Sequence, residues 1–178
     1  MNIINTKLSG CLIIEPKVFD DERGFFLETF NKARYGAIAG ITLPFVQDNH
    51  SKSSKGVLRG LHFQRTKPQG KLVRVVSGEV FDVALDMRKQ SVTFGQWHSV
   101  ILSQDNKRQF WVPPGFAHGF LVLSESADFE YKCTDFYDPE DEDIVLWNDP
   151  DLAIKWPLEH PIVSKKDANA QSFADLVL

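Results

Sequence analysis

The stretch Val57-Leu58-Arg59-Gly60-Leu61-His62-Phe63-Gln64 is rich in branched and aromatic residues, a composition typical of a β-strand. Arg59 and His62 add polar groups that a strand used only for packing does not need. A buried histidine is most often a core residue whose ring nitrogens are hydrogen-bonded. The two residues are three positions apart, so a regular strand would send them to opposite faces. If both serve one pocket, the strand must be irregular, and we predict a bulge or twist at Gly60.

The composition around this stretch indicates one globular domain that spans residues 1–178. Its 14 Phe and 4 Trp against 2 Met favour a core of flat, rigid groups, which suits stacked sheets better than a helical bundle. A net charge of -4 gives no general attraction to nucleic acid or to a lipid surface, so an anionic ligand needs a local cluster of Arg and Lys. Cys11 and Cys133 fit no metal or redox motif, and we expect two buried, reduced thiols.

No segment of the sequence has the features of a targeting or membrane-spanning element. The first apolar run, Cys11-Leu12-Ile13-Ile14, is too short for the core of a signal peptide. Later apolar runs are also much shorter than a membrane span. We therefore expect a cytoplasmic protein without a membrane partner.

Short stretches of alternating apolar residues recur between turn residues, a pattern typical of an all-β sandwich or barrel. The predicted strands are Cys11–Glu15, Gly24–Phe30, Phe45–His50, Val57–Gln64, Lys71–Val76, Glu79–Met87, Gln96–Leu102, Arg108–Val112, Gly119–Leu123, Ala127–Thr134 and Ile144–Trp147. Polar segments at 51–56 and 136–143 are predicted loops. Asn31 and Gly40 are suited to cap a short helix between them, and a helical turn is expected near Ala174. The pattern predicts a jelly roll, or double-stranded β-helix, with a few short helices at its periphery.

The segment Pro113-Pro114-Gly115-Phe116-Ala117-His118 resembles the second signature of the cupin jelly rolls, in which the histidine points into the barrel mouth. Cupins usually supply further metal ligands from a His-x-His motif and a downstream Glu. Here the matching stretch is His62-Phe63-Gln64, with Gln64 at the position of the second histidine. Two histidines without a carboxylate at ligand spacing fall short of the three protein ligands of a catalytic metal. We expect no metal site, and a histidine without a metal can still act as a base.

Several longer blocks closely resemble the dTDP-4-dehydrorhamnose 3,5-epimerase family, and they follow one another in order from about residue 2 to residue 175. The blocks are Asp21-Glu22-Arg23-Gly24-Phe25-Phe26, Phe45-Val46-Gln47-Asp48-Asn49-His50-Ser51, Val57–Gln64, Gly70-Lys71-Leu72-Val73-Arg74, Pro114-Gly115-Phe116-Ala117-His118-Gly119-Phe120, Tyr131-Lys132, Leu146-Trp147-Asn148-Asp149-Pro150 and Ser164-Lys165-Lys166-Asp167-Ala168. Blocks of this length and order are far more specific than any single motif.

The resemblance implies an isomerase that needs no cofactor and acts on a dTDP-4-keto-6-deoxyhexose, whose C4 ketone acidifies the hydrogens on C3 and C5. It implies that His62 removes these protons and that Asp167 orients and charges the imidazole. Lys71 matches the family's lysine near the C4 oxygen, where an ammonium stabilises the developing enolate. Tyr131 matches the tyrosine that returns a proton from the opposite face. The product is then dTDP-4-keto-L-rhamnose, which supplies rhamnose to a bacterial cell-surface polysaccharide.

The resemblance also implies substrate-binding residues and a homodimer in which an N-terminal segment crosses to the partner. Arg59 and Arg23 match positions that meet the pyrophosphate, a role suited to guanidinium groups. The other positions that match the nucleotide and sugar site are Glu28, Gln47, Asp48, Asn49, His118, Glu142 and Lys166. In such a dimer, Arg23 or Glu28 could serve the site of the other subunit.

Alternatives remain open from the sequence alone. The four charged residues Arg23, Glu28, Glu142 and Lys166 could each be an ordinary surface charge. Lys71 could snorkel from the start of a strand, and Tyr137 competes with Tyr131 for the role of the acid. A relative that inverts only C3 or only C5 is the nearest functional rival. A metal-dependent cupin enzyme and a non-catalytic sugar-nucleotide-binding jelly roll are the others.

Overall fold

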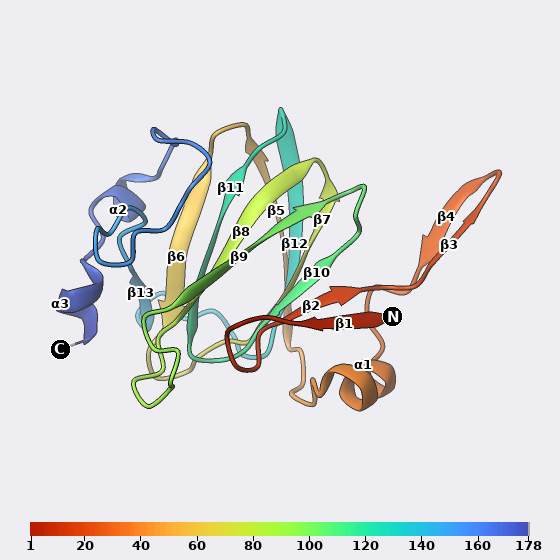
Figure 1. The fold of residues 1–178 in the computed structure, drawn as a ribbon, viewed down its shortest axis with the longest axis horizontal. Coiled ribbons are helices and arrows are strands. Elements are labelled where there is room, and N and C mark those ends of the chain that lie inside the picture. The colour runs from red at the N-terminus through yellow and green to blue at the C-terminus, as the bar shows by residue number, and fades with distance from the viewer. Residues whose placement is uncertain (178) are drawn as a thin grey trace.

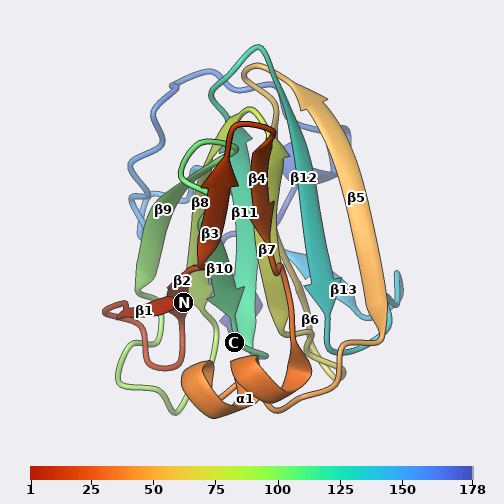
Figure 2. The same cartoon turned by 90° about the vertical axis from the view of Figure 1, so that its right-hand side faces the viewer.

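Figure 1 shows the computed structural model, which describes residues 1–177; the last residue of the predicted domain, Leu178, lies outside this range. Two antiparallel sheets face each other. The wide sheet has six strands in the order β1-β2-β10-β7-β12-β5, and the narrow sheet has five in the order β13-β6-β11-β8-β9. A separate hairpin, β3-β4, projects away from both sheets (Figure 1) and overlies them when that side faces the viewer (Figure 2). This arrangement is the predicted all-β jelly roll with short peripheral helices.

Most of the predicted strands are present, with shifted ends. The strands are β1 (Asn2–Asn5), β2 (Leu12–Glu15), β3 (Val18–Asp21), β4 (Gly24–Leu27), β5 (Gln47–Ser54), β6 (Leu58–Gln64), β7 (Lys71–Ser77), β8 (Glu79–Asp86), β9 (Trp97–Ser103), β10 (Gln109–Val112), β11 (Phe116–Val122), β12 (Ser126–Cys133) and β13 (Glu142–Ile144). The helices are α1 (Lys32–Ala39), α2 (Lys165–Ala168) and α3 (Phe173–Val177). Strands β1 and β3 were not predicted, because both are short and polar at one or both ends.

Two predicted loops are partly wrong. β5 continues through the expected loop at 51–56 as far as Ser54, and it pairs with β12 along its whole length. Its polar residues are tolerated because it is an edge strand, with every second side chain exposed. The last strand, β13, spans Glu142–Ile144, since these residues pair with β6, and it shares only Ile144 with the predicted strand Ile144–Trp147.

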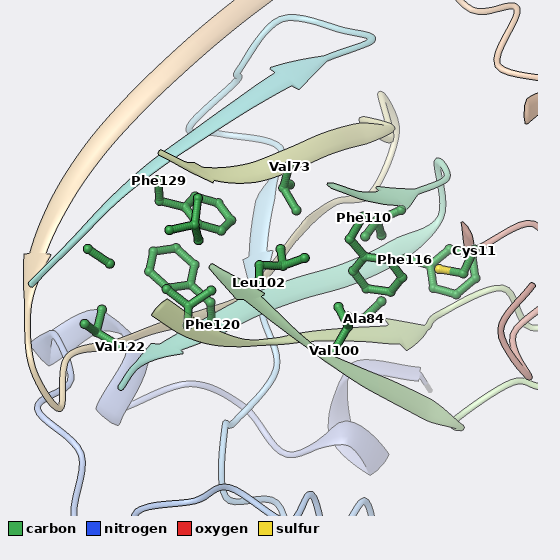
Figure 3. Close-up of a cluster of buried hydrophobic side chains, with 14 of the residues drawn as sticks. Cys11, Val73, Ala84, Val100, Leu102, Phe110, Phe116, Phe120, Val122 and Phe129 are labelled. Atoms are coloured by element: carbon green, nitrogen blue, oxygen red, sulfur yellow. The ribbon is translucent and has the colours of Figure 1, made fainter. Parts of the chain in front are cut away.

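The main core lies between the two sheets, where apolar side chains of both inner faces meet (Figure 3). Phe120 of the narrow sheet stacks on Phe129 of the wide sheet, with ring centroids 4.1 Å apart. Cys11 is buried in this core, and both it and Cys133 are free thiols, as predicted. Burial of the rigid rings fixes the distance between the sheets, and so positions any site between them.

Both sheets also bury part of their outer faces. The C-terminal segment covers the narrow sheet, where Leu61 and Leu85 pack with Leu152 and Leu176. On the outside of the wide sheet, residues of and around α1 form a third apolar cluster. The predicted caps of α1 are confirmed: the Asn31 side chain accepts a hydrogen bond from the Arg34 N–H, and Gly40 ends the helix at φ 67°. Among residues 1–177, the helices are all too short or too polar to cross a lipid bilayer.

The predicted irregularity at Gly60 is confirmed. β6 and β11 pair His62 with His118 but Arg59 with Phe120, so three steps along β6 match two along β11. Gly60 has φ 126°, and a Cβ at this position would lie 2.6 Å from the Cα of Gly119. Only glycine fits this close approach at this backbone conformation. The register shift lets Arg59 and His62 share one side of the strand.

Candidate active site

A cavity of about 260 Å³ opens between the two sheets. It is lined by Gln47 and Asn49 of β5, His62, Phe63 and Gln64 of β6, Lys71 of β7, Tyr131 of β12 and Glu142 of β13, with Gln69 and Tyr137 from neighbouring loops. All of these residues except Phe63 carry side chains that ionise or form hydrogen bonds, a dense polar lining for a space between two sheets. Three of the four residues expected to carry the chemistry, His62, Lys71 and Tyr131, line this cavity. The fourth, Asp167, lies behind His62.

His62 reaches the cavity from the narrow sheet and pairs with Asp167 of α2. Its Nε2 lies 2.7 Å from Oδ1 of Asp167, and 30% of the His62 side chain is exposed. A carboxylate only accepts hydrogen bonds, so Nε2 carries the proton and Nδ1 is left with a free lone pair. The pair therefore presents a basic nitrogen whose tautomer is fixed by its neighbour.

Asp167 is held by the short helix α2. Ser164 caps this helix, and its Oγ accepts a hydrogen bond from the backbone N–H of Asp167. Burial acts to raise the pKa of Asp167, but hydrogen bonds from His62, Ser164 and the Gly60 N–H, together with the charge of His62, outweigh it and lower that pKa overall. The carboxylate is thus ionised at neutral pH and able to orient the imidazole.

Tyr131 and Lys71 face the same cavity from the wide sheet. Burial, together with the nearby acidic groups, raises the pKa of Tyr131 to about 12, although Arg59 opposes this shift. The phenol is therefore protonated at neutral pH. Lys71 is partly buried, and burial lowers its pKa, while the charges of Cys133, Glu142 and Asp82 act in the opposite direction. A proton donor and a lysine side chain thus lie on the wall that faces His62.

Glu142, Lys166 and Tyr137 form a polar rim at the cavity mouth. The carboxylate of Glu142 accepts a hydrogen bond from Lys166 Nζ and one of 3.3 Å from the Tyr137 hydroxyl. The Glu142 side chain is largely covered, whereas 58% of Lys166 is exposed. This rim joins α2 to β13 and to the loop that directly precedes β13, with Glu142 and Lys166 24 positions apart in sequence.

The bulge at Gly60 directs Arg59 toward the space between the sheets. Its Nε donates a hydrogen bond of 2.9 Å to Ser53 Oγ on the facing strand β5. On β5, alternation brings Gln47 and Asn49 to the cavity, where the Gln47 amide donates to Asn49 Oδ1 at 3.0 Å. Gln47 and Asn49 therefore line the cavity with His62 and Tyr131, whereas Arg59 is exposed and is not part of the lining.

Three other predicted binding residues lie elsewhere in this chain. Asp48 points to the outer face of the wide sheet and accepts a hydrogen bond from Lys132, because its neighbours Gln47 and Asn49 point inward. Arg23 lies in the turn of the projecting hairpin, with 89% of its side chain exposed, and pairs with Asp21. Glu28 follows the hairpin and accepts hydrogen bonds from Asn31 and Arg34. None of these three contributes to the cavity of its own chain.

His118 lies behind the cavity rather than on its wall. Its Nε2 lies 2.9 and 3.0 Å from the two carboxylate oxygens of Asp82, and its ring stacks on Phe129. His118 was predicted to be in the binding site, but Asp82 was not identified. The available signal was the position of Asp82 between Val80 and Ala84, which puts a charge on the inner face of an apolar strand.

Gln64 and Gln69 also line the cavity and were not predicted. The Gln64 amide donates to the carbonyls of Lys67 and Phe136, and Gln69 donates to that of Asp135, so both hold the loops beside the site. Gln64 is two residues after His62 on the same strand, and alternation alone could have placed it. Within residues 1–177, no group of three or more His, Cys, Asp or Glu side chains is arranged to hold a metal ion.

Comparison with known proteins adds relatives that cover nearly the whole chain. The family model for dTDP-4-dehydrorhamnose 3,5-epimerase matches residues 5–175. The Shigella flexneri dTDP-4-dehydrorhamnose 3,5-epimerase is 57% identical over 176 residues, which are 98% of this chain and 97% of that protein. The Legionella pneumophila dTDP-6-deoxy-D-glucose-3,5-epimerase, solved in complex with dTDP-4-keto-L-rhamnose, is 62% identical, with a TM-score of 0.94 over 96% of this chain and 92% of that one.

A more distant structure is also similar. ChmJ, a 3'-monoepimerase from Streptomyces bikiniensis solved in complex with dTDP-quinovose, is 33% identical to this chain. Its TM-score is 0.89, and the match covers 95% of this chain and 86% of that one. The same fold is therefore found in proteins named as 3,5-epimerases, which invert two carbon centres, and in one protein named as a 3'-monoepimerase, which inverts a single centre.

Proposed function

The chain belongs to the dTDP-4-dehydrorhamnose 3,5-epimerase family, and from this premise we propose how its cavity carries out the reaction. The chain is an isomerase of dTDP-rhamnose biosynthesis: it converts dTDP-4-dehydro-6-deoxy-D-glucose to dTDP-4-dehydro-L-rhamnose. The assignment of its residues to steps of this reaction is our proposal. It treats residues 1–178 as one domain and the chemistry as metal-independent.

The observation that carries the proposal is the placement of His62 and Tyr131 on facing sheets. His62 reaches the cavity from β6 of the narrow sheet, and Tyr131 from β12 of the wide sheet. Inversion of a carbon centre requires removal of a proton on one face and delivery on the other. A base and an acid that face each other across one cavity supply this geometry.

In the proposed reaction, Nδ1 of His62 takes the proton from C3 or C5, and the electrons of the C–H bond move into an enolate at the C4 carbonyl. Asp167 holds the ring and stabilises the imidazolium that forms. Lys71 stabilises the negative charge that develops on the C4 oxygen. Tyr131 then gives its proton to the opposite face of the carbon, a role supported by a pKa of about 12, which keeps the phenol protonated until then.

Arg59, Gln47 and Asn49 are proposed to bind the nucleotide and sugar at the barrel mouth, with Glu142 and Lys166 at its rim. We further propose a homodimer in which the β3-β4 hairpin of each chain reaches the site of the partner. The hairpin projects from the body and exposes more than half of the Phe19, Phe25 and Phe26 residues, which is typical of a surface that binds another protein. Arg23 and Glu28 would then serve the partner's site.

A complementation experiment tests this exchange. Dimers are reassembled from equal amounts of a His62→Asn chain and an Arg23→Glu chain, each of which we expect to have little activity by itself. Random pairing makes half of the dimers mixed, and each mixed dimer has one intact site, so about one quarter of the wild-type activity returns. If each site were built from a single chain, mixing would restore no activity.

The reaction itself is tested by deuterium incorporation. The protein is incubated in heavy water with dTDP-4-keto-6-deoxyglucose, and the label is located by NMR. We expect label at both C3 and C5, with the L-sugar accumulating once a reductase removes the product. Label at one carbon would instead indicate a single-centre enzyme, an alternative favoured by the similarity to the monoepimerase ChmJ. Absence of label at either carbon would favour a non-catalytic binding protein.

The proposed metal independence of the reaction has its own test. Dialysis against a chelator should leave turnover unchanged. A loss of turnover that added metal restores would contradict the metal-independent proposal.

We also propose a cytoplasmic location, supported by the two buried free thiols, Cys11 and Cys133, since reduced cysteines persist in a reducing compartment. The product is proposed to supply rhamnose for a bacterial surface polysaccharide such as the lipopolysaccharide O-antigen.

A further inference from the structure

The β3-β4 hairpin projects from the body of the chain on two feet (Figure 1). These feet are Glu15, the last residue of β2, and Thr29, two residues after β4. Among residues 1–177, the two strands of the hairpin pair only with each other. An isolated two-stranded hairpin is marginally stable in water at best, so contacts at its feet must fix its direction.

The length of the hairpin makes its direction important for Arg23. From Thr29 to Arg23 the chain runs through six positions, about 20 Å of extended strand. A tilt of about 10° at the foot would therefore move Arg23 by about 3.5 Å. A misplacement of about 1 Å in a binding or catalytic group can lower a rate about 100-fold.

Gln109 of β10 holds the foot at Thr29. Its Nε2 donates a hydrogen bond of 2.7 Å to the Thr29 carbonyl, and its Oε1 accepts one of 2.7 Å from the Tyr35 hydroxyl of α1. The Tyr35 hydroxyl also lies 3.0 Å from the Thr29 carbonyl. Gln109 is 2% exposed and Tyr35 is 1% exposed. This buried network ties the end of the hairpin to a strand of the wide sheet and to α1.

The residue before Gln109, Arg108, holds the other foot. Its Nε and Nη2 donate hydrogen bonds of 3.0 and 2.8 Å to Oε1 of Glu15. The second carboxylate oxygen of Glu15 accepts a hydrogen bond of 3.0 Å from the Asn2 side chain. Glu15 is thus held from two sides at the point where the chain enters the hairpin.

The next residue back along the chain, Lys107, contacts the hairpin itself. Its ammonium lies 4.5 Å from the centre of the Phe25 ring on β4, a cation–π contact. Three consecutive residues therefore contact both feet and one strand of the hairpin. None of the three is among the residues that line the cavity of its own chain.

We propose that Lys107, Arg108 and Gln109 form a clamp that sets the direction of the hairpin, so that Arg23 and Glu28 arrive at the partner's site. The three are then positioning residues that act between chains: a defect in the clamp of one chain impairs the site of the other. The inference rests on the proposed exchange of hairpins and adds what aims them.

The test is the complementation behaviour of Gln109→Met, which removes the amide and keeps the length of the side chain. We expect kcat/KM of the Gln109→Met dimer to fall about tenfold. Mixed with an equal amount of His62→Asn chains, it should give about one quarter of the wild-type activity, because each mixed dimer has one site with an intact base and an intact hairpin. Mixed with Arg23→Glu chains, it should give no more than about one twentieth, because every site then receives a defective hairpin.

A role of Gln109 within its own site predicts the reverse pattern. Gln109→Met would then restore about one quarter of the activity with Arg23→Glu and no more than about one twentieth with His62→Asn. That result would overturn the inference. A general loss of stability without either pattern of recovery would also overturn it.

The ion pair at the other foot gives a second test, which leaves the buried network intact if Gln109→Met fails to fold. Arg108→Glu places two carboxylates at this foot and should lower kcat/KM about fivefold, while Tm changes by less than about 4 °C. The reversed pair Glu15→Arg/Arg108→Glu should regain at least about half of the wild-type kcat/KM. Full activity of Arg108→Glu, or no recovery in the reversed pair, would overturn the inference.

The mixture of His62→Asn with Arg23→Glu separates this inference from the proposed exchange. If this mixture restores no activity, the hairpins are not exchanged and both proposals fail. If it restores about one quarter while Gln109→Met behaves as a residue of its own site, only the clamp fails. Recovery in this mixture, together with recovery of Gln109→Met by His62→Asn and not by Arg23→Glu, supports both.

Discussion

Two histidines on neighbouring strands of the narrow sheet each pair with an aspartate, and the two pairs differ mainly in their access to the cavity. His62 and His118 are direct partners in the pairing of β6 with β11. Their Nε2 atoms lie 2.7 Å and 2.9 Å from the carboxylates of Asp167 and Asp82. The His62 side chain is 30% exposed, whereas that of His118 is 8% exposed.

The comparison shows that the same pair of residue types takes on different chemistry in different surroundings. Several hydrogen bonds outweigh the effect of burial at Asp167 and lower its pKa. At Asp82 burial dominates and raises the pKa, although His118 and Lys71 oppose it. A histidine that faces the cavity can exchange protons with a bound substrate, while one enclosed in the core can only hold its partner. Sequence motifs alone cannot distinguish these two cases.

The largest expected difference between the pairs is in turnover. His62→Asn should lower kcat about 10³-fold, because the proposed general base is lost, and should leave the affinity for dTDP unchanged. His118→Asn should lower kcat less than about tenfold, because the His118 side chain is enclosed behind the cavity wall and pairs with Asp82 instead of facing the cavity. Stopped assays of kcat and calorimetric titration with dTDP measure the two quantities. Equal losses in the two variants would remove the distinction between the pairs.

A substitution at Gly60 should disturb both pairs at once. An added Cβ would meet the Cα of Gly119 at 2.6 Å and the His118 carbonyl at 2.8 Å, so Gly60→Ala should lower the free energy of unfolding by more than about 3 kcal/mol. Gly40, which ends α1, is a control outside the hairpin: its φ is also positive, at 67°, but nothing lies within 4 Å of its added Cβ. Gly40→Ala should therefore cost only about 1 to 2 kcal/mol of backbone strain. Urea unfolding measures both, and similar costs would show that the register shift tolerates a side chain.

The sequence predicted the architecture because alternation and turn residues are local signals. The strand pattern indicated two stacked sheets, and Asn31 and Gly40 marked both ends of α1. The spacing of Arg59 and His62 even predicted the break in the ladder at Gly60. Alternation was less reliable on the edge strand β5, where exposed polar residues made a strand look like a loop.

The pairing of distant charges could not be predicted from local pattern. The contact of His62 with Asp167 was expected only through the family resemblance, since 105 residues separate them. Asp82 was missed because nothing in the sequence shows that the pairing of β8 with β11 brings it to His118. Arg23 and Glu28 show a further limit, because the family resemblance assigned both to the binding site but the structure places both away from the cavity of their own chain.

The smallest predicted effect is a difference in the pH dependence of stability. The raised pKa of Asp82 means that the folded protein binds this proton more tightly than the unfolded chain does, so its contribution to stability falls as pH rises from about 4 toward the raised pKa. The lowered pKa of Asp167 has the opposite sign, and its contribution is lost as pH falls below about 4. Each slope is at most about 1.4 kcal/mol per pH unit.

Urea unfolding of the wild type, Asp82→Asn and Asp167→Asn separates the two contributions, because groups common to all three proteins cancel in the differences. The measurements run from about pH 3 to about pH 7, a range that includes the ordinary pKa of an aspartate, about 4. The advantage of the wild type over Asp82→Asn should shrink as pH rises above about 4, while its advantage over Asp167→Asn should stay constant there and shrink below about 4. Differences that change in the same direction over the same pH range would mean that the two carboxylates experience similar surroundings. In that case burial would not be what separates the pair at the cavity from the pair in the core.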